Sequence, residues 1–198
     1  MVARPGHPDQ LTLQDFYQVA AQRGELKGYW GKRWGQTEEY YSTWISDTNL
    51  PSLTIEQAVT LYQAAGGRRS AEFKGNSLEE IRDSLDFLLY DTIKLEGRFD
   101  ECVAEGGSYK LAGAGKEFVS YLLCLRGPTL FGTWNVNAER ALRVLGMYPD
   151  TLRKGHWGLR YLDLLEVLQR VRLRFGLDDF REVDVFTHWT SESARDLR

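Results

Sequence analysis

Apolar residues recur every three or four positions along most of this chain, and alternating apolar and polar runs are nearly absent. Ser77 and Glu80 have the spacing of a helix capping box. Behind them runs the clearest apolar stripe, formed by Leu78, Ile81, Leu85, Leu88 and Leu89. This periodicity predicts amphipathic helices rather than strands. The expected fold class is therefore all-α, a compact multi-helix bundle.

The same reasoning divides the rest of the chain. Thr54 and Gln57 form a second capping box, and Gly66 and Gly67 end the helix that Thr54 opens. Further helices are expected at about 12–22, 38–47, 96–104, 116–125, 136–145, 159–174 and 179–189. Residues 28–35, 66–74 and 153–158 read as basic or aromatic loops. One globular domain over 1–198 with a polar C-terminal tail is predicted, and two helical subdomains at about 1–94 and 95–190 are the alternative.

Length and charge limit the class of protein. A chain of 198 residues, 42% of them hydrophobic, can bury a sizeable core. Its formal net charge of −3 excludes a non-specific basic coat for DNA, so DNA binding would need local phosphate contacts. No apolar run reaches the length of a membrane span, and residues 1–10 lack a hydrophobic signal core. We therefore expect a cytoplasmic protein without membrane contact.

The cysteines and histidines restrict metal and redox chemistry. Cys102 and Cys124 fall within apolar helical patterns and are expected to be reduced and buried. His7, His156 and His188 lie far apart and have few carboxylates or thiols nearby in the sequence, which argues against a metal site. No phosphate-binding loop, dinucleotide motif or nucleophile elbow is present. The prediction is that the protein uses neither a metal nor another cofactor.

The segment Gly113-Ala114-Gly115-Lys116 carries the strongest local signal for a ligand. Glycine permits positive φ and leaves no side chain between the backbone and an approaching group. The free amides at the start of the helix that begins at Lys116 can hold an anion such as a DNA phosphate. Gly113, Gly115 and Lys116 are therefore predicted DNA contacts, and a tight turn between packed helices is the alternative.

This glycine hairpin, with Asn135 about twenty residues later, resembles the helix-hairpin-helix DNA glycosylase superfamily over roughly residues 95–146. The resemblance implies a helix-hairpin-helix motif, a DNA glycosylase-like fold and a catalytic position at Asn135. The family has aspartate there, and asparagine lacks the charge that stabilises the departing sugar. Glu117 occupies the position of the lysine that forms a Schiff base in bifunctional members, which argues against lyase activity. Glu117 is the candidate for a displaced catalytic carboxylate, and a glutamate favoured by the helix dipole is the alternative.

A second resemblance covers more of the chain. Its residues are Arg98-Phe99-Asp100, Gly113 to Lys116, Ser120 to Leu123, Pro128, Phe131, Trp134-Asn135, Ala141 to Gly146 and Phe180 to Asp184. They are similar to a module of bacterial modified-DNA restriction and phage-defence systems, including relatives of McrB-type proteins. The resemblance implies DNA recognition in a defence complex and no particular activity.

Basic and aromatic residues outside the hairpin supply further candidates. An extruded base needs an aromatic pocket, and Trp134 and Tyr109 are its predicted walls, with core packing as the alternative. The three basic loops supply the other predicted DNA contacts, with plain solvent-exposed surface as the alternative: Lys32, Arg33, Arg68, Arg69 and Lys154.

Three functions follow from these observations. The preferred one is a noncatalytic DNA-binding helix-hairpin-helix protein in a bacterial defence, restriction or DNA-processing system. A glycosylase that excises a modified or damaged base is one alternative, and a protein-interaction subunit without DNA contact is the other. If Asn135 caps the next helix by accepting a hydrogen bond from the amide of Asn137 or Ala138, the chain keeps the grip on DNA without the chemistry.

Overall fold

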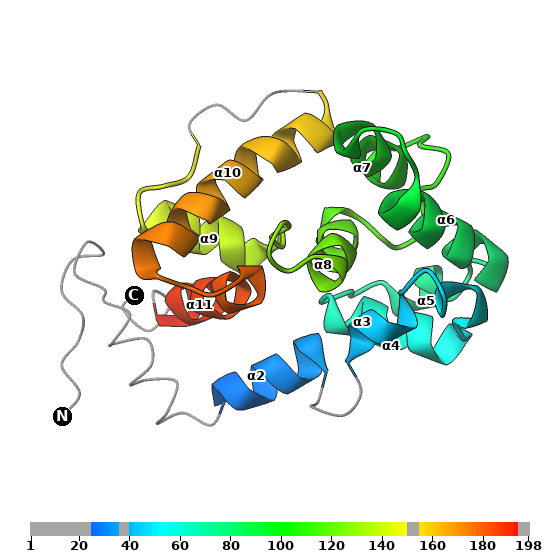
Figure 1. The fold of residues 1–198 in the computed structure, drawn as a ribbon, viewed down its shortest axis with the longest axis horizontal. Helices are drawn as coiled ribbons and strands as arrows, with labels where there is room; N and C mark the ends of the chain where they lie inside the picture. The colour runs from blue at the N-terminus through cyan, green and yellow to red at the C-terminus, as the bar shows by residue number, and fades with distance from the viewer. Residues whose placement is uncertain (1–24, 36–39, 150–154, 194–198) are drawn as a thin grey trace.

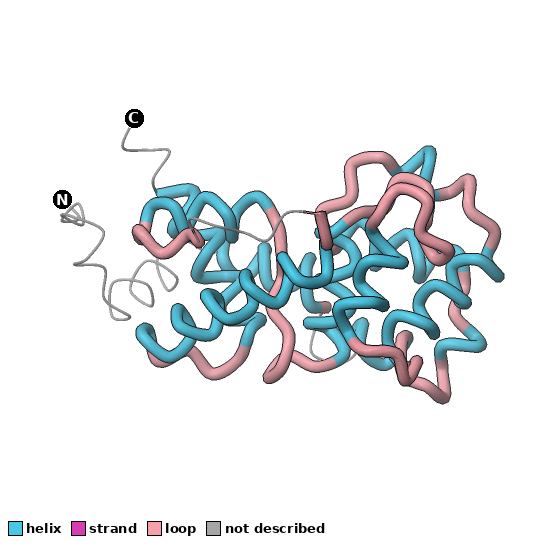
Figure 2. Tube along the Cα trace, turned by 90° about the horizontal axis from the view of Figure 1, so that it is seen from above, coloured by secondary structure: helices cyan, strands magenta, loops and turns pink. Residues whose placement is uncertain are grey.

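The computed structural model describes residues 25–35, 40–149 and 155–193, and within them all regular structure is helical (Figures 1 and 2). This confirms the all-α prediction. The elements are α2 (Glu25–Trp34), α3 (Tyr41–Trp44), the 3₁₀ turn η2 (Leu50–Ser52), α4 (Ile55–Ala64), α5 (Ser70–Phe73), α6 (Leu78–Tyr90), α7 (Leu95–Val103), α8 (Lys116–Arg126), α9 (Val136–Val144), α10 (Trp157–Phe175) and α11 (Phe180–Ser193).

Helix α8 is the centre of the bundle. Every residue from Phe118 to Leu125 is buried, so this helix is enclosed on all sides rather than amphipathic. Figure 1 shows α9, α10 and α11 on one side of it and the helices from α3 to α7 on the other. The buried apolar residues form one continuous cluster that runs from Trp34 to Trp189.

Close packing of α10 against α7 fixes the connection that leads into α9. A Cβ atom at Gly158 would lie 2.0 Å from the carbonyl oxygen of Glu96, so only glycine permits this approach. Tyr161 stacks on Phe99 with ring centroids 4.4 Å apart, and its hydroxyl donates a hydrogen bond to the Gly132 carbonyl at 2.8 Å. The chain just before Asn135 is therefore held by the core.

Both predicted capping boxes are present. Thr54 accepts a hydrogen bond from the Gln57 amide, and the Gln57 side chain accepts one from the Thr54 amide. Ser77 and Glu80 make the same reciprocal pair at the start of α6. These caps depend on residues three positions apart, which is why the sequence alone reveals them.

Two segments expected to be loops contain helices. Residues 28–35 fall largely within α2, and residues 66–74 include the short α5. Gly28 and Gly31 each weaken a helix by about 1 kcal/mol, so long-range contacts must hold α2. Those contacts come from Tyr29 and Arg33, which share one face at i and i+4 and both reach Asp184 of α11. The predicted helix at 12–22 lies outside the described residues.

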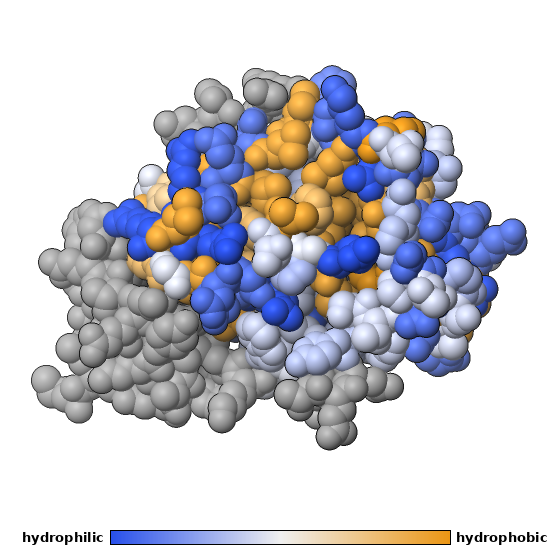
Figure 3. Space-filling view, viewed as in Figure 1, coloured by the Kyte–Doolittle hydropathy of each residue, from blue (hydrophilic) through white to orange (hydrophobic). Residues whose placement is uncertain are grey.

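Cys102 and Cys124 are free and buried, as expected. Burial raises the pKa of the Cys102 thiol to about 12 and also raises that of Cys124. Figure 3 shows apolar side chains gathered over the middle of one face of the molecule, with hydrophilic residues around them.

Candidate functional site

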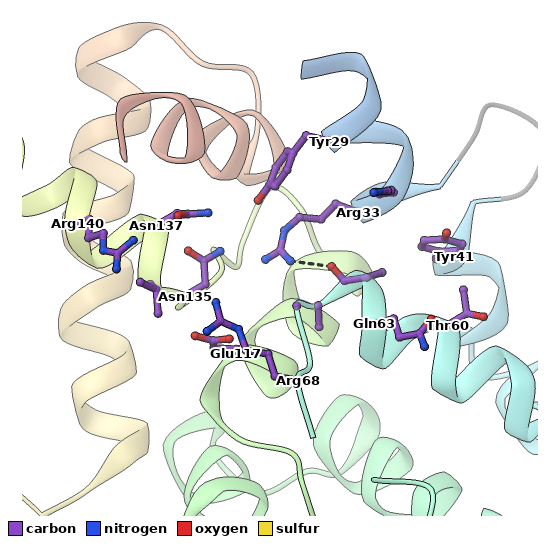
Figure 4. A pocket seen from close by; sticks show the side chains of 15 residues that line it. Tyr29, Arg33, Tyr41, Thr60, Gln63, Arg68, Glu117, Asn135, Asn137 and Arg140 are labelled. Atoms are coloured by element: carbon purple, nitrogen blue, oxygen red, sulfur yellow. Dashed lines mark hydrogen bonds between the residues drawn. The ribbon is translucent and has the colours of Figure 1, made fainter. Parts of the chain in front are cut away.

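A pocket of about 770 Å³ opens where α2, the end of α4, and the first turns of α8 and α9 meet (Figure 4). Its volume lies within the usual range for small-molecule sites. Polar side chains make most of the lining, which consists of Tyr29, Lys32, Arg33, Tyr41, Thr60, Gln63, Ala64, Ala65, Gly66, Arg68, Glu117, Asn135, Val136, Asn137 and Arg140.

The pocket is cationic because three exposed basic side chains reach it from three parts of the chain. Lys32 comes from α2, Arg68 from the turn after α4, and Arg140 from α9. None of the three forms an ion pair within the described residues. Glu117 is the one carboxylate among the described lining residues. The site is therefore suited to an anionic ligand.

One wall of the pocket is a buried network around Asp184. The Asp184 carboxylate accepts hydrogen bonds from Arg33 at 2.5 and 3.2 Å, from the Tyr29 hydroxyl at 2.9 Å and from Thr133 at 2.5 Å. Burial lowers the pKa of Arg33, but the charge of Asp184 outweighs it and the net shift is upward. Burial and Asp184 also raise the pKa of Tyr29. Arg33 thus stays charged and Tyr29 stays neutral.

Arg33 also joins helices around the pocket. Its Nη1 donates to the Ala64 carbonyl at the end of α4 at 2.8 Å, as Figure 4 shows. The Tyr121 hydroxyl of α8 donates to the Arg33 carbonyl. Because Arg33 is buried and paired with Asp184, it holds α2 in place rather than offering its charge to a ligand.

Asn135 is the N-cap of α9 and part of the same network. Its Oδ1 accepts a hydrogen bond from the Ala138 amide at 2.8 Å, which confirms that it caps the helix. Its Nδ2 donates to Asp184 at 2.8 Å and to Thr133 at 3.3 Å. With only 7% of its surface exposed, Asn135 uses its amide within the protein. Both ends of the Asn135 amide are therefore held by hydrogen bonds to other residues of the protein.

The glycines at 113 and 115 have different surroundings. Gly113 has φ of 75°, and a Cβ there would lie 2.9 Å from the Arg69 carbonyl and from the Phe73 amide. The Tyr62 hydroxyl donates to the Gly113 carbonyl at 2.8 Å. Gly113 is therefore required by packing against α5. A Cβ at Gly115 would meet nothing within 4 Å, so nothing in the described chain requires glycine there.

The segment around these glycines differs from the expected motif. Helix α7 ends at Val103 and α8 begins at Lys116, so residues 104–115 separate the two helices and a helix-hairpin-helix motif is not seen. Lys116 pairs with Glu139 and lies 4.5 Å from the centre of the Trp134 ring. These contacts direct Lys116 toward α9 and away from the role of a free phosphate ligand.

The two aromatic residues expected to form a base pocket pack within or against the core instead. Trp134 is fully buried and lies in a cluster with Phe99 and Tyr161, while its Nε1 donates to Glu139 at 2.8 Å. Tyr109 stacks on Phe87 with ring centroids 3.8 Å apart. Neither lines the pocket, so this part of the prediction is corrected. The tyrosines that do line it are Tyr29 and Tyr41.

The other predicted site residues differ in whether they line the pocket. Five of them come together in the pocket: Lys32, Arg33, Arg68, Glu117 and Asn135. Arg69 does not join them, because it pairs with Glu72 on the exposed side of α5. Lys154 lies outside the described residues. Arg140 also lines the pocket and was not predicted from the sequence. The available signal was its spacing from Val136 and Asn137, which puts all three residues on one face of α9.

No protein-family model, curated protein or solved structure matches this chain. In the part that the structure describes, no helix is both long and apolar enough to cross a membrane. The described residues also contain no group of His, Cys, Asp and Glu side chains that could hold a metal ion.

Proposed function

We propose that this protein binds DNA and that the cations around the pocket contact the phosphate backbone. The observation that carries the proposal is the convergence of Lys32, Arg68 and Arg140, all exposed and none in an ion pair within the described residues. Phosphate contacts from such side chains position a protein on DNA. Local contacts of this kind are compatible with the net charge of −3.

The start of α8 adds to this proposal. Glu117 in its first turn lines the pocket, so the positive end of the helix dipole lies close to the same space. Gly115 leaves the backbone there uncovered, as a close phosphate contact would need. We propose this half of the glycine pair, rather than Gly113 or Lys116, as the counterpart of the DNA-gripping hairpin in helix-hairpin-helix proteins.

The proposed role is binding without catalysis. Asn135, at the position of the glycosylase aspartate, has its amide engaged by Ala138, Thr133 and Asp184. One observation favours the glycosylase alternative, namely that the carboxylate of Glu117 lines the same pocket as Asn135. A bacterial cytoplasmic defence or DNA-processing system, with a protein partner, is the setting that we propose. That setting is supported by the sequence resemblance alone.

Duplex binding at several salt concentrations tests the proposal. The triple variant Lys32→Gln, Arg68→Gln, Arg140→Gln should lower affinity, and the slope of log affinity against log salt should fall by about 0.9 for each phosphate that is no longer neutralised. The matched control replaces with Gln three exposed cations that lie outside the pocket and form no ion pair within the described residues: Lys74, Lys94 and Arg126. An equal loss in the control, or no duplex binding at low salt, would overturn the proposal.

The same duplexes, prepared with a panel of modified bases, separate binding from catalysis. Binding without release of a free base supports the noncatalytic role. Release that is abolished by Glu117→Gln and kept in Glu79→Gln, which removes an exposed carboxylate outside the pocket, would establish the glycosylase alternative.

A further inference from the structure

Glu117 is an acceptor in a pocket otherwise rich in donors. It is half-buried, and its carboxylate has no hydrogen bond or ion pair with any described residue, although three basic side chains line the same pocket. Figure 4 shows Glu117 and Asn135 on one side of the pocket, with Tyr41 and Thr60 on the other. An ionised carboxylate is a strong acceptor that binds N–H groups well.

No polar neighbour of Glu117 among the described residues offers a second free, charged acceptor to the pocket. The Nδ2 of Asn135 is bound to Asp184 and Thr133, and its Oδ1 is bound to the Ala138 amide. The Asp184 carboxylate is buried behind the wall and accepts bonds from Arg33, Tyr29 and Thr133 as well. Glu117 therefore carries the charged acceptor of the pocket. A ligand that fills the site should offer a negative group to the cations and an N–H donor to Glu117.

We propose that the pocket takes one nucleotide whose base carries an exocyclic amino group, and that Glu117 selects it. The phosphate lies against Lys32, Arg68 and Arg140, and the amino group of cytosine, adenine or guanine donates to the Glu117 carboxylate. Acidic side chains read the cytosine amino group in this way in DNA complexes. Thymine has no amino group, and its one N–H donor, N3–H, lies between two carbonyl oxygens that repel a carboxylate. This inference rests on the proposed function for its DNA source, while a free nucleotide presents the same chemistry.

Titration calorimetry with dCMP, dAMP, dGMP and dTMP tests the selection on the full chain. The three amino-bearing nucleotides should bind on the order of tenfold more tightly than dTMP. Glu117→Gln and Glu117→Ala should bring the four affinities within about threefold, and dTMP should bind these variants no more weakly than it binds the wild type, because a like charge near its phosphate is gone. Equal binding of all four nucleotides by the wild type, or an unchanged preference in both variants, would overturn the proposal.

Three further ligands separate this inference from the proposed function: single-stranded oligo-dC, oligo-dT and a duplex. If the duplex binds through the pocket cations while dC and dT oligomers bind equally, DNA binding stands and the selection by Glu117 is wrong. If mononucleotides are selected but no oligomer or duplex binds, Glu117 selects a free nucleotide and the DNA function is wrong. Glu79→Gln, which removes one exposed carboxylate outside the pocket, controls for net charge alone and should leave the preference for amino-bearing bases in place.

Discussion

Replacing Asn135 with aspartate should destabilise the protein at neutral pH. The Asn135 amide donates to Asp184 over 2.8 Å, and aspartate would place a second carboxylate at that distance. Two unit charges 2.8 Å apart repel by about 6 kcal/mol at an effective dielectric constant of 20. The helix cap is not the cause, because aspartate accepts from the Ala138 amide as well as asparagine does.

Protonation sets the size and the pH dependence of the loss. The charge of Asp184 and burial raise the folded-state pKa of the new carboxyl above its unfolded value of about 3.9. The variant therefore keeps its free energy of unfolding below about pH 3.9 and loses part of it as pH rises through the folded-state pKa. Holding the proton at pH 7 costs at most about 1.36 kcal/mol for each of about three pH units, or about 4 kcal/mol. We expect a loss of about 3 to 4 kcal/mol at pH 7 and about 1 kcal/mol or less near pH 4.

Urea unfolding of the wild type and the variant at pH 4, 5, 6 and 7 measures this difference. Gln63→Glu is the matched control, since it adds the same charge to the pocket with no carboxylate partner and should change stability by less than about 0.5 kcal/mol. If Asn135→Asp lies within 1 kcal/mol of the wild type at pH 7, or loses the same stability at every pH, repulsion by Asp184 does not govern which side chain the fold accepts at position 135.

Three further results are expected. Gly113→Ala should lose about 2 to 4 kcal/mol in urea unfolding, because alanine would adopt a φ of 75° and clash with α5, whereas Gly115→Ala should stay within about 0.5 kcal/mol; similar losses would contradict the assignment. Cys102 and Cys124 should resist a thiol reagent at pH 8 until denaturant is added, because burial raises both pKa values, and rapid labelling of the folded protein would be inconsistent with this. Burial raises the pKa of Glu139, but its hydrogen bonds with Lys116 and Trp134 outweigh burial, and the net shift is downward. The stability that Glu139→Gln removes should therefore be fully present above the unfolded-state pKa of about 4.3 and should shrink as pH falls through the lower folded-state pKa. A difference in unfolding free energy between wild type and variant that is the same at every pH would refute this.

Local signals in the sequence predicted most of the helices. The caps at Thr54 and Ser77 involve residues three positions apart, and the apolar stripe after Ser77 has the helical period, so short segments carry the whole signal. The helix predicted at 116–125 corresponds to α8, whose segment from Phe118 to Leu125 is apolar except for Ser120. Asn135 capping α9 followed from the preference of asparagine for that position.

Features that depend on distant partners were not predictable in this way. Residues 28–35 read as a loop because Gly28 and Gly31 break a helical pattern, yet α2 forms because Tyr29 and Arg33 bind Asp184, more than a hundred residues away along the chain. The i, i+4 spacing of these two side chains was the one available signal. The need for glycine at position 113 comes from its packing against α5, which the spacing of the two glycines does not reveal.

The structure does place a carboxylate beside position 135. It belongs to Asp184, and hydrogen bonds from neighbouring side chains occupy both of its oxygens. Its two oxygens have about four acceptor sites, and they receive five bonds from Arg33, Tyr29, Thr133 and Asn135. At 1% exposure, with a buried guanidinium as counter-ion, Asp184 can neither face a sugar nor accept another proton donor. The difference between a binding pocket and a catalytic one therefore depends on Glu117, whose carboxylate lines the pocket and has no partner in the described chain.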